Sequence, residues 1–206
     1  MENVKAIIFD LGGVILNIDY NKTSNAFKEA GVLQIDEMYS PKTADALFQN
    51  LEEGKVTEEA FFNSIRKESG TSLSDEQITA CWNSMLLDFR TSTLSFIKTL
   101  RPRYKVFLLS NTNSIHLRHF YKIHEGLQDQ PFEAYFDAVY YSHLIGLRKP
   151  GTAAYQFVLE KNNLHAEECL FIDDLYQNIE GAKQAGLQTV LLNSEMLVEG
   201  LDIFQQ

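Results

Sequence analysis

The sequence predicts an α/β fold, a Rossmann-like parallel sheet with helices on both faces, that also contains an inserted helical-bundle cap. The apolar run Ala6–Phe9 has the length and β-branched content of a strand buried on both faces, and it ends in Asp10 and two glycines. A second apolar run, Cys169–Ile172, ends in Asp173 and Asp174. In the second half of the chain, helical and strand patterns alternate, which indicates βαβ units and a parallel sheet.

Residues 17–87 are predicted to form the cap, because helical periodicity dominates there and no convincing strand is found from about 19 to 85. One apolar helix face is expected at Ala44, Leu47, Phe48 and Leu51. Thr57 precedes two glutamates, as an N-cap precedes an acidic first turn. Ser74 and Gln77 have the spacing of a capping box at the start of a further helix.

Residues 1–16 and 88–206 are assigned to the Rossmann-like core. Its helices are predicted at 91–100, after 113, at 153–160 and at 177–185, and its later strands at 105–109, 138–141, 169–172 and 189–192. Gly186 is expected to follow the last helix as its C′ residue.

The charge balance limits the kinds of partner. The 206 residues include 28 acidic and 18 basic side chains, a net charge of −10, which argues against nucleic acid and anionic membranes as partners. An anionic substrate would then need local cations. Cys81 and Cys169 each lie in an apolar pattern, and Asp10 with two glycines interrupts the apolar run 6–16. We therefore expect a soluble cytoplasmic protein with buried reduced thiols, as a monomer or a homodimer.

Polar residues that could take part in catalysis or binding follow the predicted strands or lie in loops. They are Asp10, Ser110, Asn111, Lys149, Asp173 and Asp174. A strand-end aspartate such as Asp10 can attack an electrophile and form a covalent intermediate. Ser110 and the backbone amides after it, including that of Asn111, can bind a phosphoryl group. Lys149 precedes Pro150, which we place at the first helical position, where anions are favoured.

Carboxylates at two neighbouring strand ends imply a bound cation, because unpaired they would repel one another. Asp174, Asp10 and the backbone carbonyl of Gly12 offer the oxygen ligands that Mg²⁺ prefers, with Asp173 as a further ligand or as a residue that orients the loop. A nucleophilic carboxylate, a Mg²⁺ ion and Lys149 together suit phosphoryl transfer from a small phosphorylated substrate.

These motifs resemble those of the haloacid dehalogenase-like (HAD) hydrolases. The resemblance covers nearly the whole chain and rests on Phe9-Asp10-Leu11-Gly12-Gly13-Val14, Ser110-Asn111, Lys149-Pro150 and Asp173-Asp174. It implies a Mg²⁺-dependent phosphatase that works through an aspartyl-phosphate on Asp10. Within the family the chain is most similar to bacterial glucose-1-phosphate phosphatases and to the amino-terminal phosphatase domain of epoxide hydrolases. A sugar phosphate is the implied substrate.

One departure from the family pattern lies at Gly12, where most phosphatases of this family have a second aspartate as general acid and base. His116 is the best candidate for a substitute proton donor, although a packed or solvated helix histidine is the commoner interpretation of such a residue. Two alternatives stay open. A metal-free 2-haloacid dehalogenase would also lack that aspartate, but the pair Asp173-Asp174 disfavours it. A catalytically weak binding or regulatory protein has no physical need for a repulsive carboxylate cluster.

Overall fold

A computed structural model describes residues 3–38, 46–193 and 196–204. Its centre is a five-stranded sheet in the order β5-β4-β1-β6-β7, with every neighbouring pair parallel. The strands are β1 (Ala6–Phe9), β4 (Lys105–Ser110), β5 (Ala138–Tyr141), β6 (Cys169–Asp173) and β7 (Gln188–Leu191). The predicted Rossmann-like sheet is confirmed, with strand ends within one or two residues of the expected positions.

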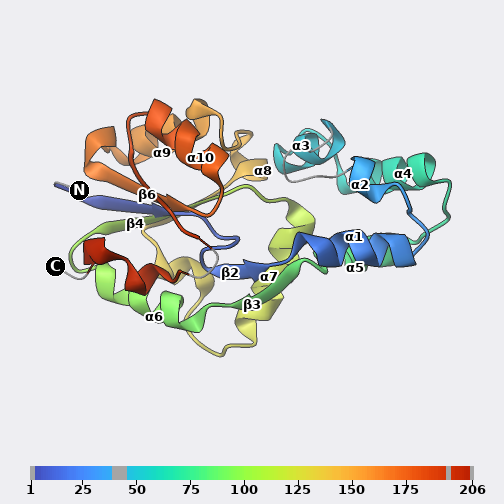
Figure 1. The fold of residues 1–206 in the computed structure, drawn as a ribbon, viewed down its shortest axis with the longest axis horizontal. Coiled ribbons are helices and arrows are strands. Elements are labelled where there is room, and N and C mark those ends of the chain that lie inside the picture. The colour runs from blue at the N-terminus through green and yellow to red at the C-terminus, as the bar shows by residue number, and fades with distance from the viewer. Residues whose placement is uncertain (1–2, 39–45, 194–195, 205–206) are drawn as a thin grey trace.

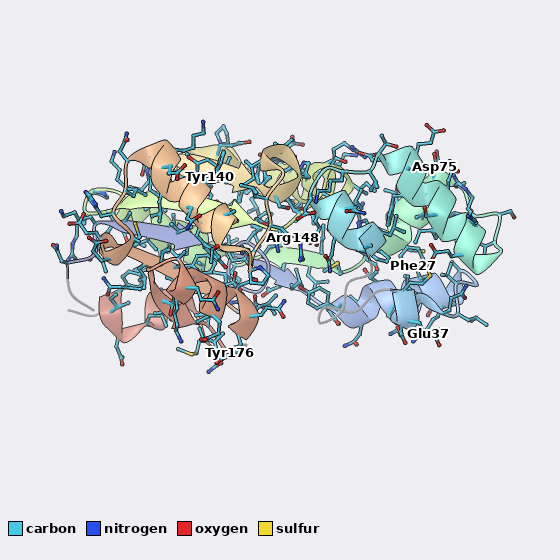
Figure 2. All side chains as sticks on the ribbon, turned by 90° about the horizontal axis from the view of Figure 1, so that it is seen from above. Phe27, Glu37, Asp75, Tyr140, Arg148 and Tyr176 are labelled. Atoms are coloured by element: carbon cyan, nitrogen blue, oxygen red, sulfur yellow. The ribbon has the colours of Figure 1, made fainter. Side chains whose placement is uncertain are left out.

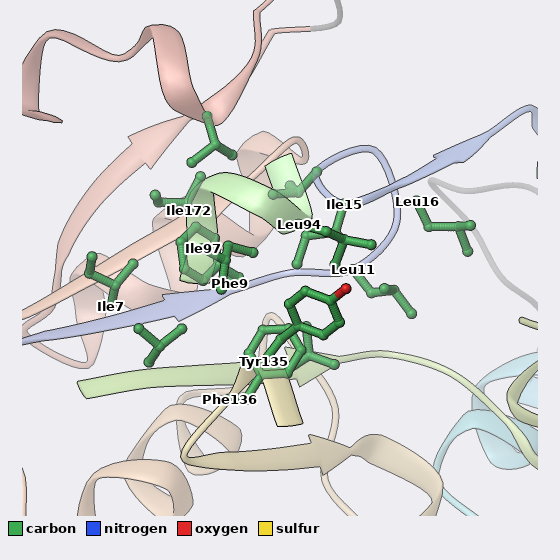
Figure 3. Packing of buried hydrophobic residues seen from close by; sticks show 14 of the residues in the cluster. Ile7, Phe9, Leu11, Ile15, Leu16, Leu94, Ile97, Tyr135, Phe136 and Ile172 are labelled. Carbon is green, nitrogen blue, oxygen red and sulfur yellow. The ribbon is translucent and has the colours of Figure 1, made fainter. Parts of the chain in front are cut away.

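Alternate side chains of β1 enter two separate hydrophobic cores, as a strand buried on both faces requires. Ile7 and Phe9 pack with helices α6 (Thr91–Leu100) and α7 (Ser114–Glu125), in the core that Figure 3 shows. Ala6 and Ile8 pack on the other face. There they meet α9 (Thr152–Asn162) and α10 (Tyr176–Gln184), which Figure 1 draws on the opposite side of the sheet from α6. Short elements complete the core: α8 (Ser142–Ile145), η1 (Phe132–Tyr135), η2 (Ala166–Glu168), η3 (Val198–Gly200) and η4 (Asp202–Phe204).

Among the residues that the structure describes, five helices form a separate body beside the sheet, where the cap was predicted (Figure 1). They are α1 (Tyr20–Glu29), α2 (Ile35–Met38), α3 (Ala46–Glu52), α4 (Glu58–Ser69) and α5 (Asp75–Asn83). Their apolar faces share one hydrophobic cluster around Phe48, Phe61 and Trp82. The Thr57 cap and the Ser74–Gln77 capping box are confirmed, whereas Ala44 lies outside the described residues.

A two-stranded antiparallel ribbon joins the helical body to the core, and the sequence did not reveal it. Its strands are β2 (Leu16–Ile18) and β3 (Leu86–Phe89). Each strand is too short to show an alternating hydrophobic pattern in the sequence. The two strands are defined only by their pairing, between segments about 70 residues apart. The predicted domain boundaries, 16/17 and 87/88, fall inside this ribbon, and the division into two domains stays a prediction.

The cap also contacts the core directly. Arg118 of α7 donates two hydrogen bonds to Glu58 at the start of α4, Nη1 to Oε1 at 2.6 Å and Nη2 to Oε2 at 2.7 Å. Gly54, at φ +67°, lies so close to α8 that a Cβ there would be 2.3 Å from the carbonyl oxygen of His143. The helical body is therefore held against the core at points on both α7 and α8.

Cys81 and Cys169 are buried and free, as predicted. No helix in the described ranges is long and apolar enough to cross a membrane.

Candidate active site

The polar site lies at the carboxyl ends of the three central strands. β1 is hydrogen-bonded to β4 on one side and to β6 on the other, with Phe9 level with Leu108 and Ile172. The residues that follow, Asp10 after β1 and Asp173 at the end of β6, therefore emerge at one edge of the sheet. Ser110 ends β4 at the same edge. The convergence of these groups is confirmed.

Lys149 links the two strand-end carboxylates. Its side chain is 1% exposed, and its Nζ lies 2.7 Å from Asp10 Oδ1 and 2.7 Å from Asp173 Oδ2. Burial lowers the pKa of Lys149, but the two carboxylates outweigh that effect and leave its pKa above the usual value. The two contacts and the direction of this pKa shift favour the charged form of the buried Lys149.

The loop that contains Lys149 is fixed by two neighbours. Asn111 accepts from the Lys149 backbone N–H at 2.9 Å and donates to its carbonyl at 2.8 Å, so this side chain holds the loop that contains Lys149. Gly181 of α10 lets the loop approach, because a Cβ there would be 2.2 Å from the Pro150 carbonyl oxygen. The predicted helix start at Pro150 is wrong. α9 begins at Thr152 after an N-cap at Gly151, because the chain first makes a turn in which the Gly151 backbone N–H donates to the Arg148 carbonyl at 3.1 Å.

Negative charge exceeds positive charge at this edge of the sheet. Burial raises the pKa of Asp10 to about 8, an effect that Lys149 reduces and Asp173 increases. Burial, followed by the charge of Asp173, raises the pKa of Asp174 to about 6. One ammonium therefore does not neutralise the carboxylates, and a cation is the natural complement.

Oxygen atoms of Asp10, Asp173 and Asp174 all lie within 4.8 Å of one another, so the three carboxylates can surround one ion. The backbone makes room for them: Gly13 adopts φ +71°, and a Cβ there would be 2.1 Å from Asp174 Oδ2. An all-oxygen donor set of this kind fits Mg²⁺ or Ca²⁺ rather than a metal that prefers sulfur or nitrogen.

The two adjacent aspartates have different surroundings. Asp173 is fully buried and accepts from Lys149, from the Leu175 backbone N–H at 2.8 Å and from Asn178 Nδ2 at 3.0 Å. Asp174 instead lines the site's cavity together with Asp10. This arrangement fits Asp174 as the direct metal ligand and Asp173 as the residue that orients the loop.

A cavity of about 100 Å³ lies between this edge and the cap. The core contributes the predicted site residues Asp10, Gly12, Ser110, Asn111, Lys149, Asp174 and His116 to its wall. The ribbon and cap contribute Ile18, Tyr20, Glu52, Met85 and Leu86, and Arg148 also reaches it. Glu52 and Arg148 are functional candidates that the sequence did not single out. Glu52 ends α3 and Arg148 precedes Lys149, and charged side chains at a helix end or in a loop are usually solvated.

His116 is a packed residue of the cap–core contact. Its ring stacks on Trp82 with centroids 4.6 Å apart, and its Nε2 lies 3.1 Å from the Trp82 carbonyl oxygen. Because a carbonyl can only accept, Nε2 carries the proton of the neutral ring. Burial lowers the pKa of His116 to about 4, so the ring is neutral near pH 7. The packing interpretation fits this geometry, and proton donation by His116 stays a hypothesis.

Ile18 occupies the space beside Gly12. Gly12 does not adopt the left-handed conformation, and a Cβ there would be 3.1 Å from Ile18 Cδ1. The backbone therefore permits a side chain at position 12, but the Cδ1 end of Ile18 occupies the space that such a side chain would enter.

Residues 4–186 match the haloacid dehalogenase-like hydrolase family. The chain is also 31% identical over 186 residues to D-ribitol-5-phosphate phosphatase of Bacteroides thetaiotaomicron, a match that covers 90% of each chain. The protein therefore belongs to the haloacid dehalogenase-like hydrolases, as the motifs indicated.

Among solved structures, the chain is similar to the HAD family enzyme bt-2542 of Bacteroides thetaiotaomicron. The magnesium complex of that enzyme has a TM-score of 0.91 at 32% identity and covers 100% of both chains. Its wild-type complex with magnesium and inorganic phosphate has a TM-score of 0.85 at 33% identity, covering 97% of this chain and 99% of that one. An L-2-haloacid dehalogenase of Xanthobacter autotrophicus shares the fold alone, with 18% identity, a TM-score of 0.62 and coverage of 92% and 77%.

Proposed function

We propose that this protein is a Mg²⁺-dependent phosphatase that removes phosphate from a small sugar-alcohol or sugar phosphate through an aspartyl-phosphate on Asp10. The observation that carries the proposal is the contact between Asp10 and the buried Lys149 ammonium, beside Asp174 and in a cavity that the cap helps to line. The relatives named for D-ribitol 5-phosphate and for bound magnesium and phosphate support it.

Each residue then has a physical task. Lys149 holds one oxygen of Asp10 at 2.7 Å, which leaves the other oxygen to attack phosphorus. The new bond joins Asp10 to phosphorus as the bond to the leaving oxygen breaks, and that oxygen takes up a proton to become the alcohol. Water then attacks phosphorus, gives up a proton and releases Asp10, so one water is consumed in each turnover. Lys149 balances charge on the transferring phosphoryl group throughout.

The metal residues we propose are Asp10, Asp174 and the Gly12 carbonyl, with Asp173 orienting the loop. When bound, Mg²⁺ supplies charge neutralisation on the phosphoryl oxygens. Ser110 lies on the cavity wall and is assigned to phosphate binding. The Thr112 backbone N–H already donates to Ser142 Oγ at 2.9 Å, so phosphate contacts fall to Ser110 and the backbone before Thr112.

The nature of the alcohol is a finer part of the proposal. The motif resemblance suggests a sugar 1-phosphate, whereas the relative named above is a sugar-alcohol 5-phosphatase. We favour the sugar alcohol because that relative spans nearly the whole chain. A cytoplasmic location and a monomeric or homodimeric state stay predictions.

The test is hydrolysis by purified protein of D-ribitol 5-phosphate and glucose 1-phosphate, each with Mg²⁺ and with a chelator. We expect Mg²⁺-dependent release of phosphate, and Asp10→Asn should abolish it while the thermal unfolding transition is kept. Activity retained in Asp10→Asn would refute the nucleophile. Halide release from a 2-haloacid in chelator would replace the proposal with the dehalogenase, and no turnover of any substrate would favour the binding protein.

A further inference from the structure

An ion pair between cap and core forms part of the cavity wall. Glu52, the last residue of α3, accepts from Arg148 Nε at 3.0 Å and from Arg148 Nη2 at 2.8 Å. The side chains are 19% and 22% exposed, and both residues line the active-site cavity. Figure 2 shows Arg148 between the helices of the cap and those of the core. The pair thus lies where the leaving part of a substrate must fit.

The pair retains hydrogen-bonding capacity beyond its two mutual bonds. Both bonds end on Glu52 Oε2, and among residues 3–38, 46–193 and 196–204 neither Glu52 Oε1 nor Arg148 Nη1 has a hydrogen-bond partner. Oε1 can accept and Nη1 can donate. A hydroxyl group does both, so neighbouring hydroxyls on a carbon chain match the two atoms.

The local charge distinguishes among possible leaving groups. The carboxylate neutralises the guanidinium, so this pair offers no excess positive charge to a second phosphate. Glu52 is also mostly buried, and this burial raises its pKa despite the nearby Arg148. An apolar leaving group would cover the free carboxylate oxygen without a hydrogen bond, which is costly for a buried charge.

Arg148 directly precedes Lys149, which contacts Asp10. The Glu52–Arg148 pair therefore lies close to the proposed position of the reacting phosphate. We propose that Glu52 and Arg148 are specificity-determining residues that bind hydroxyl groups of the leaving alcohol and select polyol phosphates over alkyl phosphates of equal length. This inference rests on the proposed phosphatase function.

The test compares D-ribitol 5-phosphate with pentyl phosphate, which has the same carbon chain without free hydroxyls. The readout is the ratio of the two kcat/KM values with Mg²⁺. The wild type should prefer the ribitol ester, and Glu52→Ala and Arg148→Met should each lower the ratio by about tenfold or more. Glu52→Gln, which keeps an oxygen in place, should recover part of it.

Glu58→Ala is the matched control. Glu58 also joins the cap to the core, through two hydrogen bonds from Arg118, but it does not line the active-site cavity. Its ratio should stay within twofold of the wild type. A ratio unchanged in Glu52→Ala and Arg148→Met, an equal fall in Glu58→Ala, or a wild type that prefers pentyl phosphate would each overturn the inference and leave the phosphatase intact. Failure of the wild type on both esters and on glucose 1-phosphate would overturn the phosphatase as well.

Discussion

Gly13→Ala tests whether Asp174 depends on the missing side chain beside it. A Cβ at Gly13 would lie 2.1 Å from Asp174 Oδ2 and 2.4 Å from Asp174 Cγ. Ordinary contact between such atoms needs about 3.5 Å, so the carboxylate must move by roughly 1 Å or more. Mg²⁺ demands near-ideal octahedral geometry with ligands at about 2.0–2.1 Å, and a displaced carboxylate no longer serves it.

Gly13→Ala also introduces backbone strain, and this effect must be separated from the displacement of Asp174. Gly13 adopts φ +71°, and an alanine in the left-handed region costs about 1–2 kcal/mol. Gly70, at φ +67° in the cap, has nothing within 4 Å of an added Cβ. Gly70→Ala therefore bears a similar backbone cost without touching the site.

The assay is the Mg²⁺ dependence of kcat/KM together with thermal unfolding. We expect each variant to lose about 2–8 °C in Tm from the backbone cost. Only Gly13→Ala should need at least about 10–100-fold more Mg²⁺ for half-maximal activity, the range seen when a metal site is disturbed. If the two variants respond to Mg²⁺ alike, Asp174 is not held in place by the space at Gly13 and the assignment of this ligand is refuted.

Three further predictions concern the same site. Lys149→Met leaves the buried carboxylates of Asp10 and Asp173 without their cation, so the free energy of unfolding in chelator should fall by about 3–5 kcal/mol, measured by denaturant titration; a loss below about 1 kcal/mol would contradict this. The pKa of His116 is lowered to about 4 from 6.5, so the neutral ring stabilises the fold above pH 6.5 and that stabilisation is lost as the pH falls toward 4. Relative to His116→Gln, the wild type should lose at most about 3 kcal/mol over this range, and parallel curves would contradict the assignment. Gly12→Asp combined with Ile18→Ala supplies a carboxylic acid and room for it, so kcat for pentyl phosphate should rise relative to p-nitrophenyl phosphate, whose leaving group needs no proton; equal ratios in wild type and double variant would show that another group already donates the proton.

The sequence by itself determined the features that depend on residues close together in the chain. The apolar run of β1 and its terminal Asp10 could be predicted because a buried strand and its end residue are encoded within one short segment. The same holds for the Ser74–Gln77 capping box and for Gly186, which adopts φ +90° after α10. Asp173 and Asp174 were expected at the site because parallel strands place their carboxyl ends at one edge whatever their separation in the chain.

The tertiary structure decided which of these groups face one another. The backbone amide of Asn111 is predicted at the phosphate, and only the structure shows that its side chain holds the backbone of Lys149. His116 stacks on Trp82, and Glu52 pairs with Arg148 across 96 residues of chain. Such pairings leave no periodicity or local spacing in the sequence, because they arise only when cap and core meet. The physical reason is that a strand or a helix cap is fixed by contacts a few residues apart, whereas the shape and selectivity of the cavity are fixed by contacts between distant segments.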